Sequence, residues 1–335
     1  MRPGLKELSK QVMVITGATS GIGLSTARMG AAGGARLVLA ARNEDALQRL
    51  TEELRGQGHD AIYVTADVGL IDDVKRIAAH AIERFGGFDT WVNNAGVGIF
   101  GKVTEVGSDD RQRLFDTDFW GTVHGCQVAL AHLKTHGGAL INVGSAFADR
   151  AAPLHGFYSA AKHAVKGYTD SLRVEAAEAD LPVAITLITP SSIDTMFPVH
   201  AKNHLDSMPK LPPPMYAPET VARAILHAAE HPKREIYVGS AGKLLAEAAY
   251  HAPRLLDKAM ELVMFGLQKT DRPRHDQPPH NLYGPQRDLD ERSGRSAYVQ
   301  ETSWYTSAIT HPAAALAVLA GAAVAAAVLL PRARQ

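Results

Sequence analysis

The sequence predicts an α/β fold built on a doubly wound, seven-stranded parallel sheet, with a helical extension at its C-terminal end. Between about residues 12 and 240, short apolar runs alternate with amphipathic stretches. The runs are rich in Val and Ile and nearly continuous in hydrophobicity, as expected when helices cover both faces of a parallel sheet. A Gly-rich turn directly follows the first run, and such a turn is typical of a strand that leads into a helix in these sheets.

Seven apolar runs are the strand candidates, and helical segments lie between them. The helix expected over Glu44–Arg55 is an example, because its apolar residues Ala46, Leu47, Leu50 and Leu54 recur at helical spacing. Alternation of strands and helices requires crossover connections, which are right-handed and place helices on both faces of the sheet. The expected strands are residues 12–16, 36–40, 61–65, 89–94, 139–144, 183–188 and 235–239.

The pattern changes after residue 240. Gly242–Leu267 is expected to be a helix that is bent or broken near Pro253. Its apolar side chains are expected to pack against the sheet edge or in an interface, and a membrane surface is the alternative. Residues 270–303 are polar and have no apolar period, so they are expected to form an extended linker. The apolar side chains in question are Leu244, Leu245, Leu255, Leu256, Leu262, Val263 and Phe265.

The far C-terminal end carries an uncharged run. Ala313–Leu330 holds ten Ala, four Leu, three Val and one Gly. As a helix it would span about 27 Å, close to the thickness of about 30 Å of a bilayer core. Aromatic residues precede the run, and Arg332 and Arg334 follow it, which is typical of membrane flanks. We expect a C-terminal membrane anchor on a cytoplasmic domain, and a buried Ala-rich helix is the alternative.

These segments divide the chain into four parts, and its composition excludes several classes of function. The expected parts are a main domain over 1–240, a helical extension over 241–269, a polar linker over 270–307 and a C-terminal hydrophobic helix over 308–335. The formal net charge of zero gives no support to a nucleic-acid partner. The single cysteine, Cys126, has no partner for an internal disulfide. No cluster of His, Cys and carboxylates has metal-ligand spacing, so no metal site is expected.

The Gly-rich turn has the composition of a phosphate cradle. The strand over 12–16 runs into the sequence TGATSGIG at Thr16–Gly23, and a helix follows from Leu24. Gly17 permits a tight turn, Gly21 lets the backbone approach a pyrophosphate, and Gly23 lets the helix pack close to the strand. The free N–H groups and the positive dipole at the start of that helix favour phosphate. The turn therefore predicts a dinucleotide site.

Further motifs follow in a fixed order. Asn93–Gly96 reads NNAG at the end of the fourth strand, Ser145 lies thirteen residues before Tyr158, and Tyr158–Lys162 reads YSAAK. Together with the TGxxxGxG turn and Pro190–Thr195, they make residues 10–240 resemble the classical short-chain dehydrogenase/reductase family. The resemblance implies a Rossmann-like fold, hydride transfer between a nicotinamide cofactor and an alcohol or carbonyl compound, and a homo-oligomeric assembly.

The expected cofactor is NADP(H) rather than NAD(H). In this fold the end of the second strand meets the adenosine ribose, where a carboxylate binds the 2′-hydroxyl of NAD and an arginine accommodates the 2′-phosphate of NADP. Here Ala41 stands where NAD-preferring relatives carry Asp, and Arg42 follows it. The resemblance assigns Asp67 to the adenine amine and Val68 to the adenine ring. The full set of expected cofactor contacts is Gly17, Thr19, Ser20, Gly21, Ile22, Gly23, Arg42, Asp67, Val68, Asn94, Ala95, Gly96, Tyr158, Lys162, Pro190, Ile193 and Thr195.

The expected catalytic residues are Tyr158, Lys162, Ser145 and Asp118. Tyr158 and Lys162 are four residues apart on an expected helix and so share one face. Carbonyl reduction needs an acid beside the developing alkoxide, and a nearby ammonium and the oxidised nicotinamide are expected to lower the pKa of the phenol toward that task. Ser145 is expected to donate a hydrogen bond to the substrate oxygen, and Lys162 to orient the nicotinamide ribose.

Two positions depart from the family pattern. Asp118 stands where the family carries the Asn that helps to position a water in a proton relay. An ionised aspartate accepts from that water but cannot donate, so we expect activity to survive with an altered pH profile. Ser191 replaces the usual Gly after Pro190, which is expected to change the backbone near the nicotinamide.

The segment after Thr195 predicts the class of substrate. It is apolar and stiffened by prolines, and together with the C-terminal run it favours a lipophilic ketone, aldehyde or alcohol. Two other functions remain open at this point: a non-catalytic, membrane-anchored NADP-binding scaffold or sensor, and an isomerase or dehydratase on the same fold. The intact Ser-Tyr-Lys set argues against the first, and the TGxxxGxG spacing argues against the epimerase branch of the second.

Overall fold

The central sheet has seven parallel strands in the order β11-β7-β6-β4-β1-β2-β3. The computed structural model of the chain describes residues 4–274, 279–286, 288–296, 298–310, 312–313 and 315–316. The sheet confirms the predicted Rossmann-like, doubly wound architecture, since the strand order reverses direction between β1 and β4. The strands are β1 (Val12–Thr16), β2 (Arg36–Ala41), β3 (Ala61–Thr65), β4 (Thr90–Asn93), β6 (Gly138–Val143), β7 (Val183–Pro190) and β11 (Glu235–Val238).

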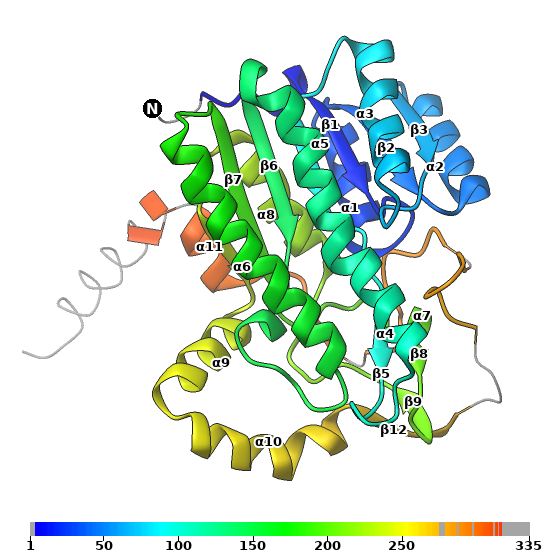
Figure 1. Ribbon diagram of the computed structural model, residues 1–335, viewed down its shortest axis with the longest axis vertical. Helices are drawn as coiled ribbons and strands as arrows, with labels where there is room; N and C mark the ends of the chain where they lie inside the picture. Colours follow the sequence, from blue (N-terminus) through cyan, green and yellow to red (C-terminus); the bar gives the residue numbers. More distant parts are fainter. Residues whose placement is uncertain are drawn as a thin grey trace, which may run out of the picture.

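Helices cover both faces of the sheet (Figure 1). One apolar core joins the sheet to α1 (Gly21–Ala32), α2 (Glu44–Gly56) and α8 (Pro218–Glu230). The other core joins it to α3 (Ile71–Phe85), α5 (Gly121–His136) and α6 (Gly156–Glu178). Because both faces are buried, the strands are apolar on both sides, which explains their nearly continuous hydrophobic runs.

Short elements surround the end of the sheet at which the parallel strands finish. The first of them are α4 (Ser108–Phe115), a π-helical turn (Asp116–Trp120), a 3₁₀ turn (Ala146–Ala148) and α7 (Phe197–His200). Another 3₁₀ turn, Leu8–Lys10, precedes β1 at the opposite end of the sheet. Short strands form three two-stranded pairs, β5 with β8, β9 with β12, and β10 with β13. Their bounds are β5 (Ile99–Phe100), β8 (Lys202–Asn203), β9 (Ser207–Pro209), β10 (Met215–Tyr216), β12 (Lys269–Pro273) and β13 (Val299–Gln300).

The helical extension is broken at Pro253, as the sequence predicts. It consists of α9 (Ser240–His251) and α10 (Pro253–Leu267), which project beyond the sheet (Figure 1). The expected packing of its apolar side chains against the sheet edge is wrong for most of them, because Leu244, Leu255 and Leu262 are 68%, 73% and 72% exposed. Val263 and Phe265 are exposed as well, whereas Leu245 and Leu256 are partly buried. The amphipathic pattern identified the helices but not what lies against their apolar faces.

The segment expected to be an extended polar linker is extended, and it docks on the main domain. Its first residues form β12 against β9, and β13 near its end pairs with β10. Between these strands, Glu291 pairs with Arg28 at 2.6 Å, and Arg292 pairs with Glu219 at 2.8 Å. The sequence did not indicate this docking, because it uses ion pairs and backbone hydrogen bonds, which leave no apolar period. The helix α11 (Trp304–Thr310) follows.

The predicted C-terminal anchor falls almost wholly outside the described residues. Of Ala313–Leu330, the structure describes Ala313, Ala315 and Leu316. Among the residues that it does describe, no helix has the length and apolar character needed to cross a membrane. The anchor therefore stays a prediction from the sequence.

Candidate active site

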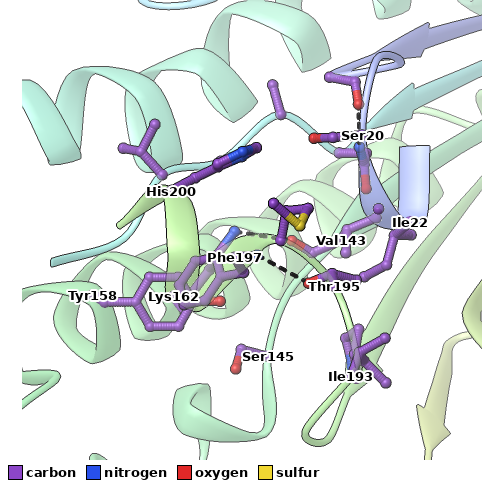
Figure 2. A pocket seen from close by; sticks show the side chains of 18 of the residues that line it. Ser20, Ile22, Val143, Ser145, Tyr158, Lys162, Ile193, Thr195, Phe197 and His200 are labelled. Carbon is purple, nitrogen blue, oxygen red and sulfur yellow. Dashed lines mark hydrogen bonds between the residues drawn. The ribbon is translucent and has the colours of Figure 1, made fainter. Parts of the chain in front are cut away.

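A single cavity of ≈ 390 Å³ brings most of the expected site residues together at the ends of the strands. It is lined by every expected cofactor contact except Gly23, and also by the expected catalytic Ser145. We call the Gly-rich turn at Thr16–Gly23 the phosphate turn. Figure 2 shows this turn, at Ser20 and Ile22, on one side of the cavity and Tyr158 and Lys162 on the other. Asp118 does not line the cavity but lies directly behind Lys162.

The glycine turn has no room for side chains. Gly17 adopts a positive φ of 66°, and a Cβ on it would lie 2.8 Å from the Cα of Ala95. A Cβ on Gly23 would lie 2.1 Å from the carbonyl oxygen of Gly17. Real Cβ atoms do not approach this closely, so both positions require glycine. The turn is thus held open toward the cavity by the close approach of backbone to backbone.

The NNAG segment locks this turn in place. The side-chain amide of Asn94 donates to the carbonyl oxygen of Thr16 at 2.9 Å. The hydroxyl of Thr16 accepts in return from the backbone N–H groups of Asn94 at 3.0 Å and Ala95 at 3.1 Å. The next residue, Gly96, lies against the expected catalytic residue Lys162, since a Cβ there would be 3.7 Å from Lys162 Nζ. One short segment therefore positions both the phosphate turn and the catalytic side.

Near the end of β2, two arginines from different elements meet the C-terminal segment: Arg42 directly follows β2, and Arg113 lies in α4. Arg42 donates from Nη1 to the carbonyl oxygen of Leu282 at 3.3 Å and from Nη2 to that of Asn281. Arg113 forms an ion pair with Asp67 and donates to the same Leu282 oxygen at 3.0 Å. Arg113 and these carbonyl groups could not be found from the sequence, because no motif connects α4 or residues 281–282 to the expected cofactor site.

Tyr158, Ser145 and Lys162 converge on one wall of the cavity. The Ser145 hydroxyl is a hydrogen-bond partner of Tyr158. Lys162 is 4% exposed, and its Nζ donates to the carbonyl oxygen of Val143 at 3.2 Å. Desolvation, and secondarily the Asp118 carboxylate, raises the pKa of Tyr158 above its ordinary value, although the Ser145 hydrogen bond lowers it. In the protein itself the phenol is therefore kept protonated, which is opposite in direction to the lowering expected from the sequence.

Asp118 is the partner of Lys162 and lies in the π-helical turn between α4 and α5. It is fully buried, with one carboxylate oxygen accepting from the backbone N–H of Val97 at 2.8 Å and the other 3.7 Å from Lys162 Nζ. Burial raises the pKa of Asp118 from 3.8 to about 6, against the lowering effects of Lys162 and the Val97 N–H. The π-turn supplies the extra residue that turns this side chain inward.

We expect the stability difference between Asp118→Asn and the wild type to depend on pH. Between about pH 4 and 6 the folded protein keeps a proton on Asp118 that the unfolded chain has lost. As the pH rises through this window, the free energy of unfolding of the wild type therefore falls by up to about 3 kcal/mol relative to that of the variant, whose amide side chain at this position does not titrate. Urea unfolding of both proteins at several values between pH 4 and 7.5 measures it; a difference that stays constant would show that Asp118 does not titrate there.

The segment after β7 closes another part of the cavity. Thr195 lies opposite the phosphate turn, since a Cβ on Gly21 would be 3.0 Å from its methyl group. Ser191, the residue that replaces the family glycine, accepts from the backbone N–H of Gly242 at 3.0 Å and donates to the Gly239 carbonyl oxygen at 3.3 Å. The Ser191 hydroxyl thus attaches the first turn of α9 to the wall of the cavity.

His155 lies near the catalytic pair but serves the structure. It is 1% exposed, contacts Gln268 at the end of α10 through Nδ1, and has a pKa lowered by burial to about 4. A neutral, buried imidazole that holds the helical extension does not need a role in proton transfer. In the part of the chain that the structure describes, no three His, Cys, Asp or Glu residues group as metal ligands.

Comparison with known proteins decides the family. A sequence model of the short chain dehydrogenase family matches residues 11–205. The chain belongs to the short-chain dehydrogenase/reductase family. Members of this family are oxidoreductases that act on CH–OH groups and bind a nicotinamide dinucleotide, so the protein is an enzyme of this type. The family match covers the phosphate turn, the Tyr-Lys pair and the β7 segment described above.

Several relatives of this dehydrogenase support the same conclusion. It is 48% identical over 320 residues to the oxidoreductase YxnA of Bacillus subtilis, covering 95% of this chain and 90% of that protein. It is 36% identical over 192 residues to an 11-beta-hydroxysteroid dehydrogenase A of Sesamum indicum, covering 57% of this chain and 54% of the relative. A crystal structure of a family member from Burkholderia phymatum in complex with NAD matches with a TM-score of 0.65 and 27% identity, covering 81% of this chain and 100% of that one.

Another structurally similar protein was solved with an NADP derivative. An alcohol dehydrogenase from Thermococcus sibiricus, complexed with 5-hydroxy-NADP, matches with a TM-score of 0.60 and 27% identity, over 68% of this chain and 95% of that one. The structural neighbours of this dehydrogenase thus include one NAD complex and one complex with an NADP derivative.

Proposed function

We propose that the protein is an NADP(H)-dependent oxidoreductase that interconverts a lipophilic ketone or aldehyde with its alcohol, with Tyr158 as the proton donor and acceptor. The observation that carries this proposal is the shared cavity, in which the glycine cradle faces Tyr158, Ser145 and Lys162. The cradle fits a dinucleotide, because its turn lines the cavity and leads into the N-terminus of α1, and its glycines leave no space for side chains in the turn. When bound, the cofactor supplies the hydride.

The chain's own residues supply position and the proton. Burial keeps Tyr158 as a neutral phenol, which is the form that donates a proton to the oxygen of a carbonyl as that oxygen gains negative charge. The Ser145 hydroxyl stabilises the same charge by a hydrogen bond. Lys162 is fixed between the Val143 carbonyl and Asp118, so its ammonium group has a defined direction toward the cavity. In the reverse reaction Tyr158 accepts the proton.

Arg42 supports the proposal that the cofactor is NADP(H) rather than NAD(H). Its guanidinium lines the cavity directly after β2, where Ala41 offers no carboxylate. We expect Arg42→Ala to weaken NADPH binding by about 10- to 100-fold and to leave NADH binding nearly unchanged, because the arginine offers charge-assisted hydrogen bonds to a 2′-phosphate. Fluorescence titration of both nucleotides measures this. Equal losses for NADPH and NADH would contradict a role at the 2′ position.

An apolar far end of the cavity supports a lipophilic substrate. Beyond Tyr158, the lining comes from the 3₁₀ turn after β6, from the segment after β7, and from α9 and α10. Its members are Phe147, Met196, Phe197, Leu211, Pro212, Pro213, Pro214, Leu245, Met260 and Met264. Relatives named as hydroxysteroid dehydrogenases are consistent with this class. We expect kcat/KM for hydrophobic ketones, steroid-like or long-chain, to exceed that for sugars of similar reactivity by at least about 100-fold. Comparable turnover of sugars would reject the proposal.

We also propose that residues 313–330 anchor the enzyme to a membrane. The support is their uncharged composition together with the exposed Leu244, Leu255 and Leu262 on the helical extension. Co-sedimentation of the full chain with liposomes tests it against a chain that ends at Pro312. Equal sedimentation of the two chains would show that residues 313–330 do not anchor the enzyme to the membrane.

A further inference from the structure

The C-terminal segment crosses the adenosine end of the cofactor cavity. We call residues 281–286 and 288–291 the strap. Gln286 accepts through its carbonyl oxygen from the Asn43 side chain at 2.9 Å. The Leu289 N–H donates to the Thr19 carbonyl oxygen at 2.8 Å, and the Gly21 N–H donates to the Asp290 carbonyl oxygen at 3.0 Å. The strap therefore joins the residue after β2 to the phosphate turn, and it passes over the space between them.

Glu291 fixes the end of the strap on α1. Its carboxylate accepts from the Ser25 hydroxyl at 2.6 Å and from Arg28 at 2.6 Å. At the other end, the Asn281 and Leu282 carbonyl oxygens accept from Arg42. With both ends held, the side chains between them have defined positions relative to the cavity, as a specificity residue requires.

Asp288 is the one acidic side chain of the strap that lines the cavity. One of its carboxylate oxygens accepts from the Thr19 hydroxyl of the phosphate turn at 2.8 Å, and the Asn43 side chain is a second partner. The carboxylate is partly buried and lies close enough to Arg42 for their charges to interact. It thus occupies the corner between the phosphate turn and the end of β2.

That corner is where this fold places the adenosine ribose. Family members that prefer NAD carry a carboxylate after the second strand, and it binds the 2′-hydroxyl. This chain has Ala41 at that position, and Asp288 brings a carboxylate to the same corner from a segment almost 250 residues away in the sequence. We propose that Asp288 is a specificity-determining residue that accepts a hydrogen bond from the ribose 2′-hydroxyl and opposes a 2′-phosphate.

The proposal deepens the cofactor assignment above and rests on it. Arg42 attracts a 2′-phosphate, and Asp288 repels it, so the preference for NADPH over NADH is the difference between two nearby charges of opposite sign. Removal of the Arg42 charge should lower the NADPH-to-NADH affinity ratio, whereas removal of the Asp288 charge should raise it. A strap that only covered the cofactor would change the affinities for NADH and NADPH together.

The test is a titration of full-length wild type, Asp288→Asn, Arg42→Ala and Glu291→Gln with NADPH and NADH. Asparagine keeps the size of Asp288 and a hydrogen-bonding oxygen but removes the charge. We expect Asp288→Asn to raise the NADPH-to-NADH affinity ratio by about tenfold, mainly by tighter NADPH binding. Glu291→Gln is the matched control, because it weakens the docking of the strap on Arg28 without altering charge beside the ribose.

Each outcome distinguishes the inference from the cofactor assignment. If the ratio in Asp288→Asn stays within about twofold of the wild type, Asp288 does not discriminate at the 2′ position and the inference is overturned. If Glu291→Gln raises the ratio as much as Asp288→Asn does, strap docking rather than the carboxylate sets selectivity, which also overturns it. If the wild type binds neither nucleotide, the cofactor assignment fails and the inference falls with it. Thermal unfolding of each variant verifies that all four proteins are folded.

Discussion

Replacement of Tyr158 by Phe is expected to lower kcat for carbonyl reduction by about 10²- to 10⁴-fold, with cofactor affinity nearly unchanged. The substitution removes the hydroxyl that would protonate the substrate oxygen. It keeps the aromatic ring, whose centroid lies 5.2 Å from that of Phe197 and 6.1 Å from that of His155. The packing of the wall is therefore preserved, and the loss is confined to proton transfer.

The measurement compares steady-state reduction of a hydrophobic ketone by the wild type, Tyr158→Phe and Tyr168→Phe. Tyr168 lies on the same helix, α6, but packs against Phe119 and does not line the cavity. We expect the Tyr168→Phe variant to keep kcat within about twofold, since its hydroxyl has no route to the substrate. A Tyr158→Phe enzyme with kcat near that of the wild type would mean that another group or solvent donates the proton.

The second large effect is expected at the start of α1. A Cβ on Gly23 would lie 2.1 Å from the Gly17 carbonyl oxygen and 2.6 Å from the Asn94 side-chain nitrogen. Gly23→Ala must therefore displace the phosphate turn, and a shift of about 1 Å in such a site is sufficient to cost on the order of 100-fold. We expect at least that loss of NADPH affinity, together with a fall of about 1–3 kcal/mol in the free energy of unfolding.

Gly30 provides the matched control on the same helix. A Cβ there would lie 3.6 Å from Leu226 and 3.6 Å from Leu37, which are ordinary contacts. Gly30→Ala is expected to keep the nucleotide affinity and to stabilise the helix slightly, because Ala has the higher helix propensity. Fluorescence titration and urea unfolding of both variants measure the contrast. Equal nucleotide affinity in the two variants would show that the turn is not held by this close approach.

Tyr158 and the phosphate turn lie on opposite walls of one cavity, and the NNAG segment connects these walls. Asn94 holds the phosphate turn through a hydrogen bond to Thr16. A Cβ added to Gly96 would lie 3.6 Å from each carboxylate oxygen of Asp118. Lys162 and Asp118 are buried behind this segment. Changes on the catalytic side are therefore expected to act on proton transfer, and changes in the turn to act on cofactor affinity, because each wall is fixed by its own hydrogen bonds.

The seven strands, and most of the residues that line the cavity at their ends, could be predicted from the sequence alone. The strands are apolar on both faces, so their runs are visible without any knowledge of contacts. Gly17 and Gly23 are visible in the sequence because a tight turn needs glycine at particular positions. Tyr158 and Lys162 are visible because residues four apart share one face of a helix. The break at Pro253 is likewise local, because proline ends a helix through its own ring.

The way in which distant segments complete the site depends on long-range contacts and could not be predicted from the sequence. The strap meets Arg42 and Thr19 through backbone carbonyls and the Asp288 carboxylate, and nothing in residues 281–291 marks these contacts as a pattern. The burial of Asp118 against Lys162 and the exposure of Leu255 on α10 also depend on how elements lie against one another. Periodicity reports which face of an element is apolar, whereas the partner of that face, and the environment that shifts a pKa, are set by long-range packing.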